Sequence, residues 1–183
     1  MRIAEAISKH GRQAVRRYRD VAGVRQDNEL PEIFLGGMIA CGIHDDLNLS
    51  AHVERLYTTI AKELGRTIDP KLINLFGGQR ADVAVYEDER PIAIIELKKF
   101  DDWKSPAGIV ADRDKVKFLA QECGISSYLG VLVTDVEKPT LMTYSQRRSL
   151  LEASLGQSFE VPGESEWTSD KRWEWCFAAV KVT

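Results

Sequence analysis

The stretch of sequence that decides the fold runs from residue 81 to residue 98 and reads ADVAVY, EDERP and IAIIELK. The first and last of these segments are rich in the β-branched residues that favour strands. The middle segment is polar and ends in Pro91, which cannot donate a hydrogen bond to a neighbouring strand. The last segment is apolar on both faces until its end, as in a strand that is covered on both sides. The sequence therefore predicts a hairpin of two central strands joined by a five-residue polar loop.

The expected register of this hairpin brings charged side chains together. A five-residue loop would pair Tyr86 with Ile92. Counting back along both strands then puts Asp82 opposite Glu96, on the same face of the sheet. Lys98 lies two residues beyond Glu96 and shares that face. Two carboxylates and one ammonium are therefore expected to converge at one end of two central strands.

This group of charges indicates a chemistry, because burying an ion without a partner costs several kcal/mol. Two facing carboxylates also repel each other, and a divalent cation between them removes that repulsion. Carboxylate oxygens suit Mg²⁺ or Mn²⁺. An ammonium beside such an ion can orient or deprotonate a water and offset charge that builds up on phosphorus. The pattern predicts metal-dependent hydrolysis of a phosphodiester; the alternative is a Glu-x-Lys salt bridge at an exposed strand end of a structural domain.

The rest of the chain alternates between helical and extended patterns. Apolar residues recur at helical spacing in four segments, residues 2–21, 31–44, 105–124 and 143–155. Strands are expected at residues 128–134 and 172–182, and residues 47–65 fit a short strand that runs into a helix. Pro31 suits the first turn of the second helix. This interleaving predicts an α/β fold with a mixed central β-sheet flanked by helices on both sides and an added N-terminal helix.

The N-terminal segment, residues 1–26, is expected to form a basic amphipathic helix. Residues 1–25 hold seven basic and two acidic side chains, a net charge of +5, and because the whole chain carries −3, the remainder carries −8. Its basic residues recur on one face, where we expect contacts with nucleic-acid phosphates that do not read bases. These residues are Lys9, Arg12, Arg16 and Arg19. A solvated helix face, or a helix that pairs two subunits, would show the same pattern, and Gly11 weakens the helix by ~1 kcal/mol relative to alanine.

Composition excludes several other classes of protein. The longest apolar run, residues 33–43, is far shorter than the ~20 residues that a membrane span needs. Glu5 stands where the apolar part of a signal peptide would begin, so we expect a cytoplasmic protein with no membrane partner. The three cysteines are far apart and form no CxxC pair, which argues against a disulfide framework or a cysteine zinc site. Nothing in the sequence indicates an organic cofactor.

Two triplets carry a resemblance to a known family. Arg80-Ala81-Asp82, followed fourteen residues later by Glu96-Leu97-Lys98, resembles the motif of the PD-(D/E)xK restriction-endonuclease-like superfamily. The resemblance covers roughly residues 29–135 and includes the order of the expected elements; the usual proline before the aspartate is Ala81 here. It implies an αβββαβ core within a nuclease-like domain of residues 27–183. It also implies Mg²⁺ (or Mn²⁺) bound by Asp82, Glu96 and the carbonyl of Leu97, with Lys98 assisting the attacking water.

The resemblance further implies a glutamate on the first core helix, and two positions compete for it. Glu32 opens a very apolar helix that is separated from Asp82 by room for one strand, whereas Glu54 lies in the ambiguous segment that follows. We prefer Glu32, although an acidic residue is favourable at a helix N-terminus without any catalytic role. Asp112 and its neighbours Arg113 and Asp114 fit a solvated helix face, although the resemblance implies that this helix borders the site.

The function expected from these residues is a metal-dependent nuclease that acts on DNA. Cutting both strands of a duplex needs two active sites, which favours a homodimer. The alternative is a nuclease fold that has lost activity and serves as a nucleic-acid-binding or protein-interaction module. DNA and RNA as substrates, and endonuclease and exonuclease action, remain open at this point.

Overall fold

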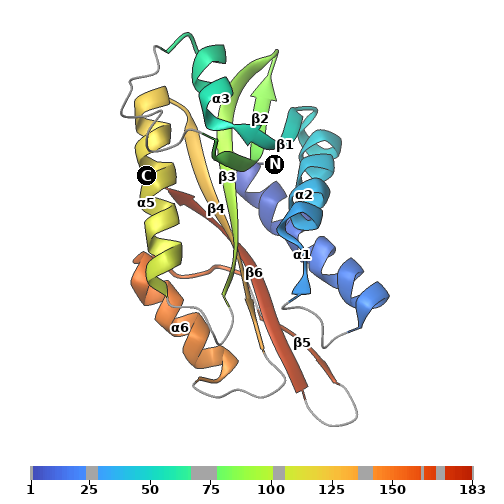
Figure 1. The fold of residues 1–183 in the computed structure, drawn as a ribbon. Coiled ribbons are helices and arrows are strands. Elements are labelled where there is room, and N and C mark those ends of the chain that lie inside the picture. Colours follow the sequence, from blue (N-terminus) through green and yellow to red (C-terminus); the bar gives the residue numbers. More distant parts are fainter. Residues whose placement is uncertain are drawn as a thin grey trace.

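The computed structural model describes residues 2–23, 29–66, 78–100, 106–135, 142–161, 163–167 and 172–182 (Figure 1). The helices in this part of the chain are α1 (Ile3–Ala22), α2 (Glu32–Leu47), α3 (Tyr57–Glu63), α5 (Pro106–Cys123) and α6 (Tyr144–Leu155). The strands are β1 (Ser50–Leu56), β2 (Arg80–Glu87), β3 (Arg90–Phe100), β4 (Ser126–Thr134), β5 (Glu164–Trp167) and β6 (Arg172–Val182). Each predicted helix and strand is present among these elements, including the short strand and helix within residues 47–65.

The strands form one six-stranded mixed sheet in the order β1-β2-β3-β4-β6-β5. β3 and β4 are parallel, and the other neighbouring pairs are antiparallel. The predicted α/β class and mixed sheet are confirmed, and β3 lies in the middle of the sheet as its apolar sequence indicated. β5 was not predicted, because a four-residue strand is too short to show an alternating pattern.

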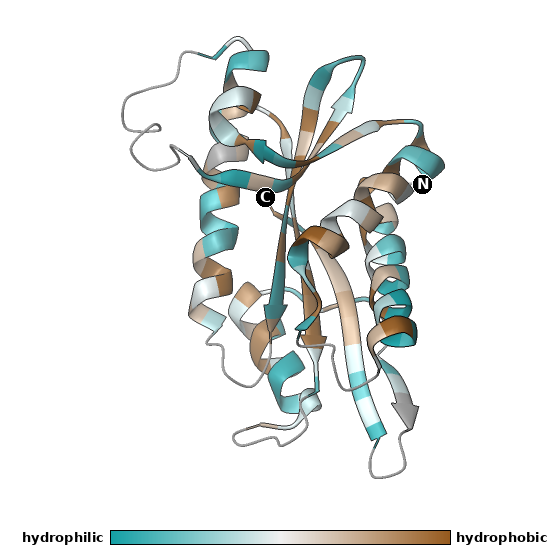
Figure 2. Ribbon diagram, turned by 45° about the vertical axis from the view of Figure 1, so that its right-hand side comes forward, coloured by the Kyte–Doolittle hydropathy of each residue, from teal (hydrophilic) through white to brown (hydrophobic). Residues whose placement is uncertain are grey.

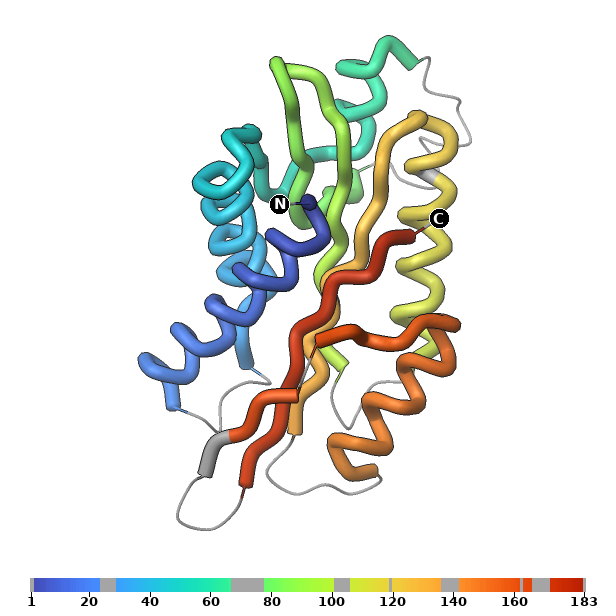
Figure 3. Tube along the Cα trace, turned by 180° about the vertical axis from the view of Figure 1, so that it is seen from behind, coloured from blue at the N-terminus to red at the C-terminus, as the bar shows by residue number. Residues whose placement is uncertain are grey.

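Helices cover both faces of the sheet. α1 and α2 pack on one face, whereas α3, α5 and α6 lie on the other (Figures 1 and 3). The side chains of β3 alternate between the two faces of the sheet. Ile95 and Leu97 belong to the core beneath α1 and α2. Ile94 and Phe100 belong to the cores on the opposite face. Hydrophobic stretches occur along the strands, and the covering helices alternate between hydrophobic and hydrophilic residues (Figure 2).

α1 belongs to the core rather than lying on the surface as an appendage. Ala6, Ile7 and Ala14 are fully buried, and α1 packs against α2 and β6. The predicted weak point, Gly11, has a packing reason: a Cβ there would lie 2.1 Å from the ring of Phe177. The absence of a side chain therefore lets α1 approach the sheet closely, which offsets the poor helix propensity of glycine.

The loop of the β2–β3 hairpin is shorter than predicted. Two residues, Asp88 and Glu89, form the turn with φ angles of 46° and 66°. Two successive residues with positive φ are typical of the type I′ turn, whose twist matches that of the strands it joins. Tyr86 consequently pairs with Pro91, and the predicted pairing with Ile92 is wrong.

A β-bulge then restores the register on which the predicted site depends. The pairing shifts between Val85 and Tyr86, so one extra residue is absorbed in the ladder. Beyond the bulge Val83 pairs with Ile95, which is the register predicted from the longer loop. The shorter turn and the bulge therefore cancel each other before the strands reach the charged residues.

The ends of α2 also differ in detail from the prediction. Pro31 occupies the N-cap position in an extended conformation instead of the first turn. The helix continues to Leu47 and ends at Asn48, which adopts the left-handed conformation with φ 55°. In the described part of the chain, no helix is long and apolar enough to cross a membrane.

Candidate active site

Asp82 and Glu96 lie opposite each other on the central hairpin. One further step beyond the Val83–Ile95 pair puts Asp82 opposite Glu96, as predicted. The carboxylate of Asp82 accepts a hydrogen bond through Oδ2 from the backbone N–H of Leu97, at 2.6 Å. Glu96 is 2% exposed, so its carboxylate is held inside the protein.

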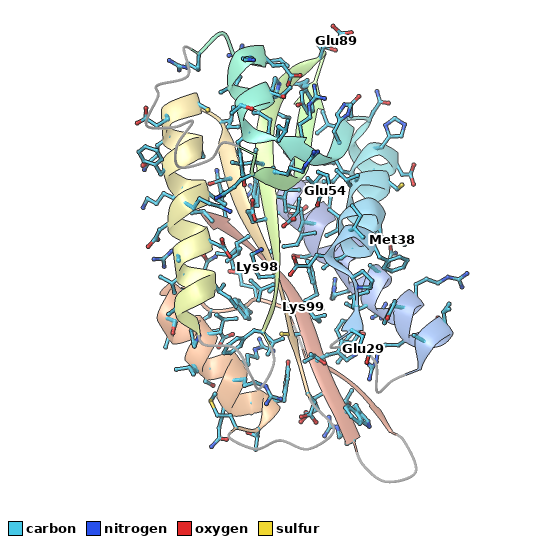
Figure 4. The ribbon with its side chains drawn as sticks, viewed as in Figure 1. Glu29, Met38, Glu54, Glu89, Lys98 and Lys99 are labelled. Carbon is cyan, nitrogen blue, oxygen red and sulfur yellow. The ribbon has the colours of Figure 1, made fainter. Side chains whose placement is uncertain are left out.

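Lys98 connects this hairpin to two helices on different sides of it (Figure 4). Its Nζ lies 3.8 Å from Oε2 of Glu96 and 3.7 Å from Oδ2 of Asp112 on α5. The same atom lies 4.0 Å from Oε2 of Glu32, which is the first residue of α2. The predicted residues Glu96, Lys98 and Glu32 are thus brought together, and Asp82 faces Glu96 from the neighbouring strand.

α5 contributes two charged residues that the sequence analysis did not assign to the site. The prediction of a solvated face is wrong for Asp112, which contacts Lys98. One turn further along, Nζ of Lys115 lies 3.4 Å from Oδ1 of Asp112 and 3.6 Å from Oε1 of Glu96. A detectable signal existed: Asp112 shares the helical spacing of the buried residue Val116 and interrupts that apolar stripe.

Tyr57, the first residue of α3, supplies a neutral group. Its hydroxyl donates a hydrogen bond to Oε1 of Glu96, and its ring lies 5.6 Å below Nζ of Lys115. The side chain is 5% exposed. The sequence showed Tyr57 only as one apolar position of a short helix, and nothing in its spacing indicated a contact with a carboxylate.

The resulting cluster has more negative than positive charge. Among the residues that the structure describes, four carboxylates and two ammonium groups lie in it and leave an excess of two negative charges when all six are ionised. The carboxylates are Glu32, Asp82, Glu96 and Asp112, and the ammonium groups are Lys98 and Lys115. A divalent cation carries the charge that would balance this excess.

The surroundings shift the pKa values of the central groups. Burial, together with the neighbouring carboxylate of Glu96, raises the pKa of Asp82 to about 7. Burial also raises the pKa of Glu96, although the hydrogen bond from Tyr57 acts in the opposite direction. Burial by itself would lower the pKa of Lys98, but the surrounding carboxylates outweigh it and raise that pKa. Lys98 therefore carries its proton at neutral pH.

The oxygen donors fit Mg²⁺ or Mn²⁺ in kind, since both ions prefer carboxylate oxygens. Oδ2 of Asp82 and Oε1 of Glu96 are engaged by protein donors, which leaves Oδ1 and Oε2 for a ligand. Within the described residues, no three Asp, Glu, His or Cys side chains are close enough together to form a metal-binding group. A cation here would therefore complete its coordination with water and backbone oxygens, as Mg²⁺ commonly does.

The two candidate helix glutamates occupy different kinds of element. Glu32 is on a helix and reaches Lys98, whereas Glu54 is on strand β1. Glu54 has a positive φ of 55°, and its backbone carbonyl accepts a hydrogen bond from Arg80 at 2.8 Å. Its neighbours in β1 pair with β2 on either side of Asp82, but its exposed side chain does not contact Lys98.

The basic residues of α1 are not brought to this cluster. α1 packs on the face of the sheet that Leu97 lines, opposite the face of Glu96. Lys9 pairs with Asp46 at 2.7 Å, and Arg16 pairs with Glu164 at 2.7 Å.

The prediction of a solvated basic face is wrong for Arg19. This side chain is 5% exposed and lies over the ring of Trp175, 5.6 Å from the ring centroid. The Nε of Arg12 donates to the carbonyl of Ser8 on the same helix. The four basic residues of α1 therefore do not form one solvated face. The reason is that α1 contacts other elements through its polar side as well as through its apolar side.

No family model matches the chain, and neither a curated protein nor a solved structure matches it.

Proposed function

We propose that this chain is a metal-dependent nuclease that hydrolyses phosphodiester bonds at the cluster around Lys98. The observation that carries the proposal is the position of the Lys98 ammonium, within 4.0 Å of carboxylates from β3, α2 and α5. The excess of carboxylates around the buried Glu96 is unfavourable to the fold without a cation, because like charges repel and an unbalanced buried carboxylate is costly. Clusters of groups with shifted pKa values are characteristic of functional sites.

The order of the elements supports the same proposal. The chain runs α2, β1, β2, β3, α5 and β4, with the short helix α3 inserted after β1. This agrees with the αβββαβ core that the resemblance to the PD-(D/E)xK superfamily implies. Asp82 and Glu96 then stand on the two neighbouring strands where that family carries its metal ligands.

The residues of the cluster that surround Lys98 receive roles in this proposal. Asp82, Glu96 and the carbonyl of Leu97 would hold Mg²⁺ or Mn²⁺. Such a cation would supply activation of a water and stabilisation of negative charge on the phosphate. Lys98 keeps its proton, so it orients the attacking water and donates hydrogen bonds to phosphate oxygens. Glu32, together with Asp112, keeps Lys98 protonated and directed toward the hairpin.

The wider features of the function are proposals of the same kind. We propose DNA as the substrate and a homodimer as the form that cuts both strands of a duplex. We also propose that the protein acts in the cytoplasm. A side chain of α1 can bind a phosphate only if it leaves its present partner. Arg12 is therefore a better candidate for such a contact than the buried Arg19.

The first part of the test is metal binding. Calorimetric titration with Mn²⁺ should show binding to the wild-type protein and none to Asp82→Ala. Asp114→Ala is the matched control, because Asp114 lies exposed on α5 and pairs with Arg113 outside the cluster. Equal affinity in all three proteins would place any bound cation elsewhere and remove the basis of the proposal.

The second part is cleavage of nucleic acid. Supercoiled DNA, linear duplex DNA and single-stranded RNA are incubated with Mg²⁺ or Mn²⁺ and with each of the same three proteins. We expect cleavage by the wild type and by Asp114→Ala, and none by Asp82→Ala. Metal binding without cleavage of any substrate would instead favour the inactive module that binds nucleic acid or protein.

A further inference from the structure

We infer that Tyr57 is a positioning residue of this site, which holds Glu96 through Oε1 and thereby leaves Oε2 to face Lys98 and the cation. The inference rests on the proposed function for the presence of the cation. Its geometric part rests on the contacts of Glu96 and Tyr57 themselves.

The backbone fixes the place from which Tyr57 acts. It is the first residue of α3, immediately after β1, and its N–H donates to the carbonyl of Gln79 at 3.2 Å. α3 packs against the three strands β1, β2 and β3, so the buried ring is enclosed between helix and sheet. A buried phenolic hydroxyl needs a hydrogen-bond partner. Glu96 provides that partner from the middle of the sheet.

The two oxygens of Glu96 have unequal surroundings. Oε1 accepts from Tyr57 and lies 3.6 Å from Nζ of Lys115. In the described part of the chain, Oε2 lies near Nζ of Lys98, and this distance of 3.8 Å is longer than either contact of Oε1. Nζ of Lys115 also lies above the Tyr57 ring, 5.6 Å from its centroid. Tyr57 and Lys115, which both contact Oε1, therefore also attract each other through a cation–π interaction.

The neighbouring carboxylate is arranged in the same way. Oδ2 of Asp82 is engaged by the N–H of Leu97 at 2.6 Å, and within the described residues Oδ1 has no hydrogen-bond donor. Each of the two central carboxylates therefore has one oxygen held by the protein. Partners that orient a metal-binding carboxylate typically change metal affinity by ~10- to 100-fold when they are removed. We expect that range for loss of the Tyr57 hydroxyl.

The test compares two tyrosines that each donate to a glutamate. Tyr57→Phe removes the hydroxyl on Glu96 and keeps the ring below Lys115. Tyr86→Phe is the matched control, since the Tyr86 hydroxyl donates to Glu63 at 2.7 Å and does not touch Glu96. Both variants and the wild type are labelled with ¹³C at the glutamate side-chain carboxyl, and each is studied without metal and then with Mn²⁺.

Without metal, the carboxyl resonance of Glu96 should move in Tyr57→Phe and stay in place in Tyr86→Phe. An unmoved resonance in Tyr57→Phe overturns the inference, whatever the metal results are. With Mn²⁺, calorimetry should show affinity reduced ~10- to 100-fold in Tyr57→Phe and unchanged in Tyr86→Phe. Unchanged affinity in Tyr57→Phe would also overturn it, because a purely structural tyrosine alters stability and not metal binding.

The two proposals fail in different ways. A wild type that binds no divalent cation, with the Glu96 resonance still moved by Tyr57→Phe, would overturn the nuclease proposal and support the orientation of Glu96 by Tyr57. If Tyr57→Phe did not fold, Glu96→Gln would test the same hydrogen bond by changing its acceptor instead of its donor. The hydroxyl proton resonance of Tyr57 should then shift, and an unshifted resonance would overturn the inference.

Discussion

Two regions of the molecule gather charged side chains, α1 on one face of the sheet and the cluster around Lys98 at the central hairpin. On α1 two basic side chains have carboxylate partners on other elements, since Lys9 pairs with Asp46 and Arg16 pairs with Glu164. Around Lys98 the carboxylates of the described residues exceed the ammonium groups by two when all are ionised. The N-terminal segment stood out most in the sequence, yet Lys9 and Arg16 are engaged by carboxylates, whereas the cluster formed by residues distant in sequence holds more carboxylates than ammonium groups.

The largest expected difference between the two regions is in catalysis. Lys98→Ala should lower the rate of cleavage by ~10²-fold or more, the usual scale for a positioned proton-transfer or charge-stabilising group. Lys9→Ala, which removes a lysine that is equally engaged with a carboxylate, should leave the rate unchanged. Single-turnover cleavage with Mg²⁺ measures both. Equal rates in Lys98→Ala and the wild type would remove Lys98 from the catalytic groups.

The second prediction concerns the pH dependence of stability in metal-free protein. The pKa of Asp82 is raised from its ordinary value of 3.8 to about 7, so the folded state binds this proton more tightly than the unfolded state. The free energy of unfolding should therefore fall as pH rises from about 4 to 7. The shift corresponds to roughly 4 kcal/mol, which solvent screening at this partly exposed carboxylate reduces to ~1–2 kcal/mol.

Urea unfolding in the presence of a chelator measures this effect. Asp82→Asn should show a smaller decline between acid and neutral pH, because asparagine does not titrate and the raised pKa of Glu96 still contributes. The difference between the variant and the wild type isolates the contribution of Asp82 from that of the other carboxylates. The same pH dependence in both proteins would show that Asp82 is not held in an unfavourable charged state.

A third prediction gives the two regions effects of opposite sign. The hydrogen bond from Lys9, followed by that from His10, lowers the pKa of Asp46, so its charged form stabilises the fold above about pH 4. Asp46→Asn should consequently lower the melting temperature at pH 8, whereas Asp82→Asn should raise it in metal-free protein. Calorimetric melting with excess chelator compares the two. A rise in both variants would contradict the stabilising role of the pairing between Asp46 and Lys9.

The smallest expected effect is on the salt dependence of DNA binding. Each phosphate contact contributes about 0.9 to the slope of log affinity against log salt for duplex DNA. If Lys9, Arg12, Arg16 and Arg19 each bound a phosphate, replacing all four with glutamine would flatten the slope by ~3 to 4. Since Lys9 and Arg16 are paired and Arg19 is buried, we expect a change of ~1 or less. A change of 3 or more would show that these ion pairs open on binding.

Much of the fold was determined by local sequence patterns. The apolar run ending at Glu96 indicated a central strand, and helical spacing identified α1, α2, α5 and α6 within a few residues. These features follow from side-chain period and backbone preference, which act over neighbouring residues. The position of Asp82 opposite Glu96, one residue beyond the Val83–Ile95 pair, was also predictable. The predicted loop was wrong, since a two-residue turn and a bulge replace the five-residue loop.

The rest of the site was decided by tertiary structure alone. Tyr57 and Lys115 are separated by 58 residues in the sequence, yet both contact Oε1 of Glu96 because α3 and α5 pack on the same face of the sheet. The burial of Arg19 and the need for Gly11 likewise depend on Trp175 and Phe177 of β6. The sequence specified which residues carry charge, and the packing of distant elements determined which charges are neutralised. The physical reason is that Coulomb energy and desolvation depend on distance and burial, which are set when the layers assemble.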